Sequence, residues 1–380
     1  MNLTFKPIRT KTNLHEFIHF PWTIYSSDRN WVPPLLTDRY AKVDIEKNPF
    51  WHSAERELWL AEKDGKPAGT IAAIINHQRN EKLKDGVGMF GFFESIDDPA
   101  VARGLVDVAV DWLKNHKLDI IRGPYNPSES DEVGILVDGF DTRPALLEAH
   151  TPPYYSALLE SAGMVKYQDI VARMRLVPPE LHDLSEALPE KFIKVARLVK
   201  KRPDLLLRPV DMKRWDEEIR VACDIYNQAL GTLPEYIPMS QDEFREFANS
   251  FKSIMDPNLG RLAIVNGKPV GFALALPDFN QALKHVNGKL NLPGLLKLLW
   301  FGRHLDRVSF KILVMIPEFI GSGIETLLTL EICEEIMHKG YREVDMSLTG
   351  DENEKSNLYQ ERLGMQVYRR YRIYEKDLRS

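Results

Sequence analysis

The chain repeats one of its segments after about half its length. The pattern Leu-Ala-x-x-x-Gly-Lys-Pro-x-Gly occurs at 60–69 and again at 262–271, a shift of 202 residues. A short apolar segment at 3–7 matches 205–209 at the same shift. One period this long, seen twice, indicates two copies of a domain rather than an array of short repeats. The length of 380 residues agrees, because domains commonly hold roughly 100–200 residues.

The repeat sets the expected domain boundaries. We expect an N-terminal domain over 1–176 and a C-terminal domain over 205–380. The segment 177–204 begins close to a pair of prolines and is interpreted as a linker. Its basic stretch, 191–202, is interpreted as a solvated helix, because runs of charge usually face water.

Both copies show the same order of elements. A short strand and helices precede a hairpin, and the hairpin precedes a strand that leads directly into a long helix; a further strand and a last helix follow. An Asp-Gly at 64–65 and an Asn-Gly at 266–267 indicate the two hairpin turns, because both turn positions need positive φ. Apolar residues at helical spacing over 101–112 and 324–336 indicate the long helices. We therefore expect an α/β fold, with a mixed central sheet flanked by helices in each copy.

Composition and charge narrow the classes of partner. The net charge of −5 gives no reason to expect nucleic acid. Two cysteines do not make a disulfide framework. The first ten residues contain no apolar signal-peptide region, and no uninterrupted apolar run approaches the roughly 18 residues that indicate a membrane span. We expect a cytoplasmic protein without a nucleic-acid or membrane partner, and a homodimer is possible.

One motif suggests zinc but is rejected. His15-Glu16-x-x-His19 matches the pattern that places two imidazoles on one helical face of a zinc protease. Pro21 follows immediately and is expected to break the helix. No convincing third ligand follows the motif, so we expect no metal site.

The junction between strand and long helix in the second copy carries the most specific motif. It reads Glu318-Phe-Ile-Gly321-Ser-Gly323 after an apolar strand. The amides and dipole of a helix N-terminus favour a polyanion, and glycines let a phosphate approach the backbone. With this motif and its order of elements, the chain resembles the GNAT superfamily of acyl-CoA-dependent N-acyltransferases. The resemblance covers both copies and implies two tandem GNAT-like domains.

The resemblance implies a coenzyme A site in the second copy. Its glycine loop would cradle the pyrophosphate of an acyl-CoA, taken as acetyl-CoA, and Asn353 would lie near the cofactor arm. The expected cofactor-binding residues are Ile316, Ile320, Gly321, Ser322, Gly323, Ile324 and Asn353. The first copy has Asp97, Asp98 and Pro99 at the same junction. An aspartate there is expected to cap the helix, so this copy is expected to lack a coenzyme A site.

The resemblance also implies candidate catalytic residues. The family's tyrosine, which protonates the departing thiolate, falls on Gln360, and the neighbouring Tyr359 is the candidate to replace it. The segment that commonly walls the acceptor pocket contains Glu235 and Tyr236. We expect Glu235 to accept the amine proton and Tyr236 to pack on the substrate.

The first copy contains an insertion at 124–153 that is rich in polar and aromatic residues and in proline. A loop this long within a compact domain is usually functional or disordered. We expect it to reach the cleft of the second copy and to supply Asn126, Asp131, Glu132 and Tyr155 to the acceptor. The alternative is packing between the domains.

The function predicted from these observations is acyl transfer from acetyl-CoA, or another acyl-CoA, to a primary amine of a small molecule or peptide. Two alternatives stay open. Glu318 and Gln360 depart from the family pattern and fit a non-catalytic ligand-binding or regulatory protein. Fem-type transferases, which use aminoacyl-tRNA, also have a paired scaffold of this kind. The insertion at 279–300 fits either a lid over an acyl chain or a dimer surface.

Overall fold

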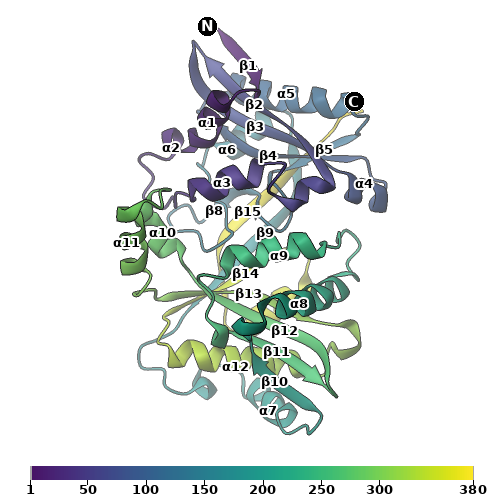
Figure 1. Ribbon diagram of the computed structural model, residues 1–380, viewed down its shortest axis with the longest axis vertical. Coiled ribbons are helices and arrows are strands. Elements are labelled where there is room, and N and C mark those ends of the chain that lie inside the picture. The colour runs from purple at the N-terminus through teal and green to yellow at the C-terminus, as the bar shows by residue number, and fades with distance from the viewer. Residues whose placement is uncertain (1, 380) are drawn as a thin grey trace. The chain divides into compact units, whose positions relative to one another are not determined.

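The computed structural model describes residues 2–379, and its elements are labelled in Figure 1. Contacts among Cα atoms divide the chain into two units. Unit 1 contains Met1–Val171, Ala282–Leu299 and Tyr368–Ser380, and unit 2 contains Ala172–Gln281 and Trp300–Val367. These ranges differ from the expected boundaries, because an insertion of the second copy and the end of the chain group with the first.

Unit 1 is built on a mixed sheet in which β4 and β5 are parallel and the other described pairs are antiparallel. The strand order is β1-β2-β3-β4-β5-β15, with β8 also paired to β15. The strands are β1 (Leu3–Pro7), β2 (Ala54–Lys63), β3 (Lys66–Asn76), β4 (Val87–Ser95), β5 (Ile120–Gly123), β8 (Ile135–Asp138) and β15 (Gln366–Asp377). A separate small sheet pairs β6 (Tyr125–Asn126) with β7 (Glu132–Val133). Two of the four divisions between the units fall within β15 and within β9 (Val165–Leu176), and the other two fall within helices α10 (Asn280–Val286) and α11 (Leu292–Phe301).

The helices of unit 1 include the long helix that the sequence predicts over 101–112. They are α1 (Lys11–His19), α2 (Pro21–Ile24), α3 (Leu36–Val43), α4 (His77–Leu83), α5 (Pro99–Asn115) and α6 (Tyr155–Ser161), with most of α10 (Asn280–Val286) and α11 (Leu292–Phe301). Helix α1 ends at His19 and α2 begins at Pro21, which confirms the expected break. Asp98 caps α5 by accepting from the Ala100 amide, with Pro99 in the first turn, and this confirms the expected cap.

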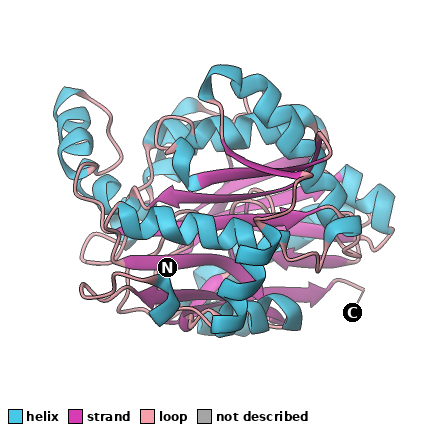
Figure 2. Ribbon diagram, turned by 90° about the horizontal axis from the view of Figure 1, so that it is seen from below, coloured by secondary structure: helices cyan, strands magenta, loops and turns pink. Residues whose placement is uncertain are grey.

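Unit 2 has the strand order β14-β13-β12-β11-β10. Its strands are β10 (Leu205–Pro209), β11 (Gly260–Val265), β12 (Lys268–Pro277), β13 (Arg307–Met315) and β14 (Glu343–Gly350). Its helices are α7 (Glu190–Val199), α8 (Trp215–Leu230), α9 (Gln241–Phe251), α12 (Ile324–His338) and α13 (Glu354–Arg362). Short 3-10 turns also occur in the chain: η1 (Pro49–His52), η2 (Leu184–Glu186), η3 (Met212–Arg214), η4 (Pro257–Leu259) and η5 (Pro317–Phe319). Figure 2 shows helices on both sides of the strands. The expected α/β class is confirmed.

Helix α7 corrects the interpretation of the basic stretch as solvated. Its Ile193, Ala196 and Val199 are buried in the core of unit 2. These residues recur at intervals of three and therefore form one apolar stripe between the lysines and arginines. The segment expected as a linker thus contributes a packed helix to unit 2.

The two predicted hairpins are present. Asp64 and Gly65 have φ of 52° and 79°, and Asn266 and Gly267 have φ of 49° and 77°. The turn of the first hairpin joins β2 to β3 and that of the second joins β11 to β12, and both pairs are antiparallel. The repeated sequence pattern therefore corresponds to a repeated hairpin.

Candidate functional sites

The parallel strand pair of unit 2 leads into the predicted glycine loop. The register of β13 and β14 runs from Arg307 opposite Glu343 to Phe310 opposite Met346. Strand β13 continues beside β12 as far as Met315, and η5 follows it. Because β13 extends past its described pairing with β14, the loop lies at the end of the sheet where that parallel pair has stopped.

The loop has the conformation that its glycines predict. Gly321 and Gly323 have φ of 79° and 83°, in the left-handed region that favours glycine. The Ser322 amide donates to the Phe319 carbonyl at 3.1 Å, and α12 begins directly afterwards. The expected loop residues lie in different surroundings: Ile316 and Ile324 are buried and Ile320 is exposed. Glu318 is exposed and so does not fill the loop.

The two glycines face different surroundings. A Cβ atom on Gly323 would lie 2.9 Å from methyl carbons of Val195 and Val199 on α7. A Cβ atom on Gly321 would meet no atom within 4 Å. Gly323 therefore allows close packing of α7, whereas the Gly321 side of the loop has room for a ligand to approach the backbone.

The expected residues of α13 are engaged within unit 2. Asn353 caps α13 by accepting from the Ser356 amide at 3.2 Å. The Tyr359 hydroxyl lies 2.7 Å from Oγ1 of Thr329 on α12, and burial raises the pKa of Tyr359. Gln360 is buried. Its amide nitrogen donates to Oγ1 of Thr349 at 2.8 Å.

The expected acceptor residues of unit 2 lie between α8 and α9. Glu235 is exposed. The Tyr236 hydroxyl donates to Oδ1 of Asn227 on α8 at 2.5 Å, and burial raises the pKa of this hydroxyl. Their roles toward a substrate stay predictions.

Unit 1 contains a buried carboxyl group that the sequence analysis missed. Glu94, at the end of β4, is 9 % exposed. Its Oε2 accepts hydrogen bonds from the hydroxyls of Tyr155 at 2.6 Å and Tyr25 at 2.9 Å. Burial raises the pKa of Glu94 to about 7, although the two hydrogen bonds oppose this shift. In the sequence, this group is indicated by a single glutamate in a strand whose other residues are apolar, small or aromatic.

The insertion of unit 1 brings the other expected residues to β4 and α3. Oδ1 of Asn126 accepts from the Phe92 amide at 2.6 Å. Asp131 pairs with Lys42 at 3.0 Å, and Glu132 pairs with Arg39 at 3.4 Å. These contacts, like that of Tyr155 with Glu94, lie within unit 1. Their expected role toward an acceptor stays a prediction.

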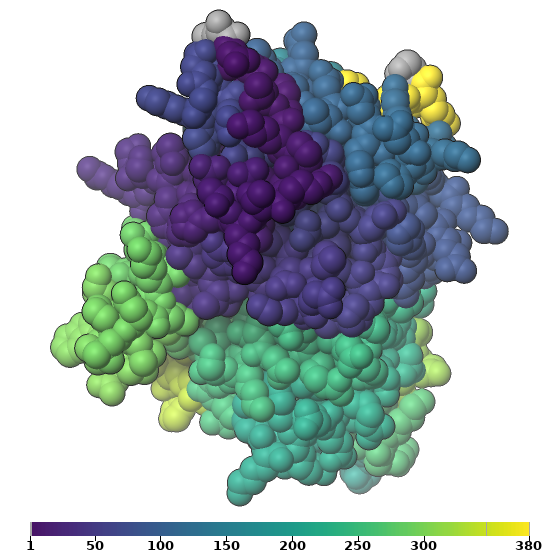
Figure 3. Space-filling view, turned by 45° about the horizontal axis from the view of Figure 1, so that its top comes forward, coloured from purple at the N-terminus to yellow at the C-terminus, as the bar shows by residue number. Residues whose placement is uncertain are grey.

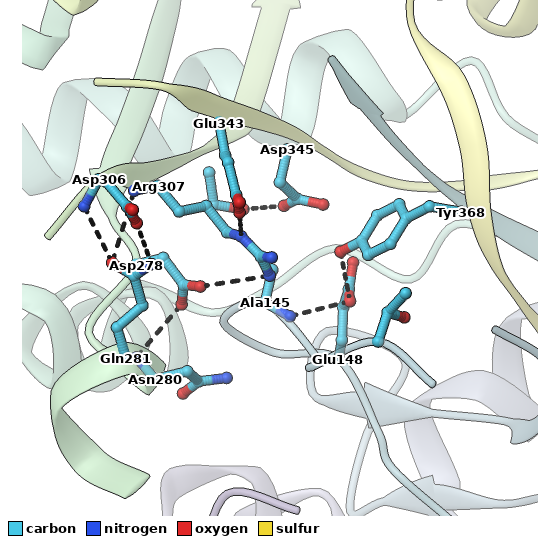
Figure 4. Close-up of polar contacts among 12 residues, drawn as sticks. Ala145, Glu148, Asp278, Asn280, Gln281, Asp306, Arg307, Glu343, Asp345 and Tyr368 are labelled. Atoms are coloured by element: carbon cyan, nitrogen blue, oxygen red, sulfur yellow. Dashed lines mark hydrogen bonds and ion pairs between the residues drawn. The ribbon is translucent and has the colours of Figure 1, made fainter. Parts of the chain in front are cut away.

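A second charged cluster lies in unit 2, at the beginning of β13 and β14 (Figure 4). Arg307 donates from Nε to Glu343 at 2.6 Å, and its Nη1 lies 3.7 Å from Oδ2 of Asp278. Asp278 is fully buried, and burial raises its pKa to about 6 against the opposing charge of Arg307. Since the glycine loop follows the other end of β13, this cluster is not part of the loop site.

Figure 4 also labels Glu148, which belongs to unit 1. Its Oε2 accepts from the Tyr368 hydroxyl at 2.9 Å and from the Ala145 amide at 3.0 Å. Because Tyr368 belongs to β15, its bond to Glu148 attaches that strand to the insertion of unit 1, whereas the Ala145 bond lies within the insertion.

Comparison with known proteins assigns the chain to a family. No protein-family model matches it. The bacterial ceramide synthase of Caulobacter vibrioides is 31 % identical over 385 residues, covering 99 % of this chain and 98 % of that protein. The chain belongs to the family of that protein. The family also includes protein YghO of Escherichia coli, 30 % identical over 97 % of this chain and 94 % of that protein.

The solved structures show the fold of this family member. A tandem GNAT protein from the clavulanic acid biosynthesis pathway superposes with a TM-score of 0.57 and 12 % identity, covering 99 % of both chains. At this identity the likeness concerns the fold. The expected architecture of two tandem GNAT-like domains is confirmed.

Proposed function

We propose that this protein is an acyl-CoA-dependent N-acyltransferase that forms an amide on a long-chain amino alcohol. The observation that carries the proposal is the 31 % identity, over 99 % of the chain, to a protein named bacterial ceramide synthase. A ceramide is the fatty-acid amide of a long-chain amino alcohol, so its synthesis from an activated acid is an N-acyl transfer. The GNAT fold supports the same class of reaction.

The acyl donor is proposed to bind in unit 2 at the Gly321 side of the loop. The N-terminus of α12 supplies amides and a dipole that favour the pyrophosphate. The space beside Gly321 supports this position, since a bulky neighbour there would keep a phosphate from the backbone. Asn353 is proposed to lie near the arm of the cofactor, and acetyl-CoA and longer acyl-CoAs are the donors to be compared.

The reaction is proposed to begin when the amine nitrogen attacks the thioester carbonyl. The new C–N bond forms, the C–S bond breaks, and the amine loses a proton to a base, for which Glu235 is the proposed residue. Tyr359 is proposed to protonate the leaving thiolate. A tyrosine hydroxyl is protonated at neutral pH, which is the form that a proton donor needs, and Tyr359 has its hydroxyl 2.7 Å from Oγ1 of Thr329.

Thermal unfolding with acyl-CoA ligands tests the donor site. The wild type, Gly321→Asp and a control, Gly267→Asp, are each heated with acetyl-CoA, a long-chain acyl-CoA or no ligand. Gly267 is a matched control because its φ of 77° and its free space resemble those of Gly321, but it lies in a hairpin turn. A donor at 100 times its Kd adds about 2.7 kcal/mol of stability.

We expect this stabilisation in the wild type and in Gly267→Asp, and its loss in Gly321→Asp. Equal stabilisation of all three proteins would contradict the loop site. No stabilisation of the folded wild type by any donor would contradict acyl-CoA dependence and favour a non-catalytic protein.

A further inference from the structure

Helix α11 carries its apolar face on the outside. Four leucines at positions i, i+3, i+4 and i+7 form this face: Leu292, Leu295, Leu296 and Leu299. They are 72, 44, 59 and 55 % exposed, and the adjacent Trp300 is 64 % exposed. A surface helix normally turns such a stripe toward the core. Within α11, all of which the structure describes, only Gly294 is buried, and its position on the helical wheel is roughly opposite the leucines.

The surroundings of this face are basic. From Phe279 to Leu305 the sequence contains no aspartate or glutamate. The same stretch has four permanent cations: Lys284, Lys289, Lys297 and Arg303. Among the described residues, the structure records no ion pair for any of these four. The stretch that carries the apolar face therefore has a formal charge of +4 with its histidines neutral, although the whole chain has a net charge of −5.

The base of the α10–α11 segment is fixed to unit 1. The Trp22 indole donates to Oδ1 of Asn287 at 2.9 Å, and the Leu36 amide donates to the Gly288 carbonyl at 2.9 Å. Gly288 has a φ of 78°, and a Cβ atom there would lie 2.6 Å from the Trp22 ring. Figure 3 shows the segment in light green as a projecting cluster of atoms. The exposed leucines are therefore on an anchored helix.

An aromatic series leads from this base into unit 1. Trp22 packs edge-on against Trp31, with ring centroids 5.2 Å apart. Trp31 stacks on Tyr25 at 4.9 Å, and the Tyr25 hydroxyl bonds to the buried Glu94. The segment is thus connected through packed rings to the buried carboxyl group of its unit.

We propose that α11 docks the protein on a bilayer surface that carries anionic headgroups. The leucines and Trp300 would enter the interfacial layer, and the four cations would face the phosphates, as in amphipathic helices that lie on membranes. No helix among the described residues is long and apolar enough to cross a membrane, so α11 would lie on the surface. A lid over an acyl chain would turn the leucines inward, and a symmetric dimer through this face would bring like charges together.

This inference goes beyond the proposed function and does not rest on it. It differs from the expectation, drawn from sequence, that the protein has no membrane partner, and the experiment below decides between them. Anionic headgroups are favoured over neutral ones because each lysine or arginine near such a surface contributes about 1 kcal/mol.

Vesicle co-sedimentation of the full chain tests the proposal. Vesicles of phosphatidylcholine alone are compared with vesicles that also contain phosphatidylglycerol. The variants are Leu296→Glu with Leu299→Glu, and Lys297→Gln. Leu198→Glu is the control, because Leu198 is a 70 % exposed leucine on another helix, α7. Thermal unfolding and sedimentation velocity of each protein report folding and oligomeric state.

We expect binding to the anionic vesicles that weakens with salt, is lost in the double leucine variant, and weakens about fivefold in Lys297→Gln. The control should bind as the wild type does. Equal binding to neutral vesicles, or unchanged binding by the folded double variant, would overturn the proposal. A dimer that the double variant abolishes, without vesicle binding by the wild type, would show that a second copy covers this face.

Discussion

Glu94 is the residue whose surroundings most affect its chemistry. Its side chain is enclosed by Tyr25 and Tyr155, and burial raises its pKa from 4.5 to about 7. In the unfolded chain the group ionises at lower pH than in the folded chain. Its contribution to stability is therefore fully present below about pH 4.5 and is lost as the pH rises through about 7.

We predict that Glu94→Gln removes this pH dependence. Relative to the variant, the wild type should lose roughly 3 kcal/mol of unfolding free energy between pH 4.5 and pH 8, because one pKa unit corresponds to about 1.4 kcal/mol. Urea unfolding across this range measures the difference. Glu81→Gln, an exposed glutamate on α4, is the control. If the unfolding free energies of Glu94→Gln and the wild type changed with pH in the same way, Glu94 would not be the source of this pH dependence.

Tyr359 gives a second prediction for a single residue. If its hydroxyl protonates the leaving thiolate, Tyr359→Phe should lower kcat on the order of 100-fold and leave the affinity for the acyl-CoA unchanged. Loss of the bond to Thr329 should also cost about 1 kcal/mol of stability. Steady-state kinetics and urea unfolding separate these effects. Unchanged kcat with reduced stability would identify Tyr359 as a packing residue.

Among the elements, the glycine loop shows what can be predicted from sequence. Its position after an apolar strand and before a long helix was predictable, because local spacing determines both elements. The packing of α7 on Gly323 was not, because it depends on a contact between segments far apart in the chain. For the same reason the charged residues of α7 suggested a solvated helix, although Ile193, Ala196 and Val199 face the core.

This packing predicts unequal effects of alanine at the two glycines. Both changes should cost about 1 kcal/mol because both positions have positive φ. Gly323→Ala should cost a further 1–3 kcal/mol, roughly, because its Cβ atom would crowd Val195 and Val199. Urea unfolding of the two variants measures the difference. Equal destabilisation would show that α7 does not pack closely on Gly323.

At the scale of the whole molecule, the repeat predicted two domains but not how the chain is shared between them. Residues Tyr368–Ser380 group with unit 1, and β15 pairs with β5 and β8 of that unit. Arg369, Tyr371 and Tyr374 are fully buried there. Sequence spacing cannot reveal a pairing across more than 200 residues. The role of Glu94 was equally hidden, since Tyr25 and Tyr155 reach it from distant segments.

We predict that a chain ending at Val367 loses the structure of unit 1 and keeps that of unit 2. The truncation removes three fully buried side chains and the strand beside β5, and each large buried side chain contributes several kcal/mol. Hydrogen exchange should show lost protection in β4 and β5 and retained protection in β12 and β13. A chain ending at Leu378 is the control. If β5 kept its protection from hydrogen exchange in the truncated chain, the last residues of the chain would not be needed for the structure of unit 1.

The most direct test of the proposed function is detection of its product. Purified protein is incubated with a long-chain acyl-CoA or acetyl-CoA and a long-chain amino alcohol, and mass spectrometry follows the amide and free coenzyme A. We predict that the wild type and Gly267→Asp each form the amide and free coenzyme A in equal molar amounts. Folded Gly321→Asp should form neither product. A folded wild type that binds the donor but forms no amide would contradict N-acyl transfer to this class of amine.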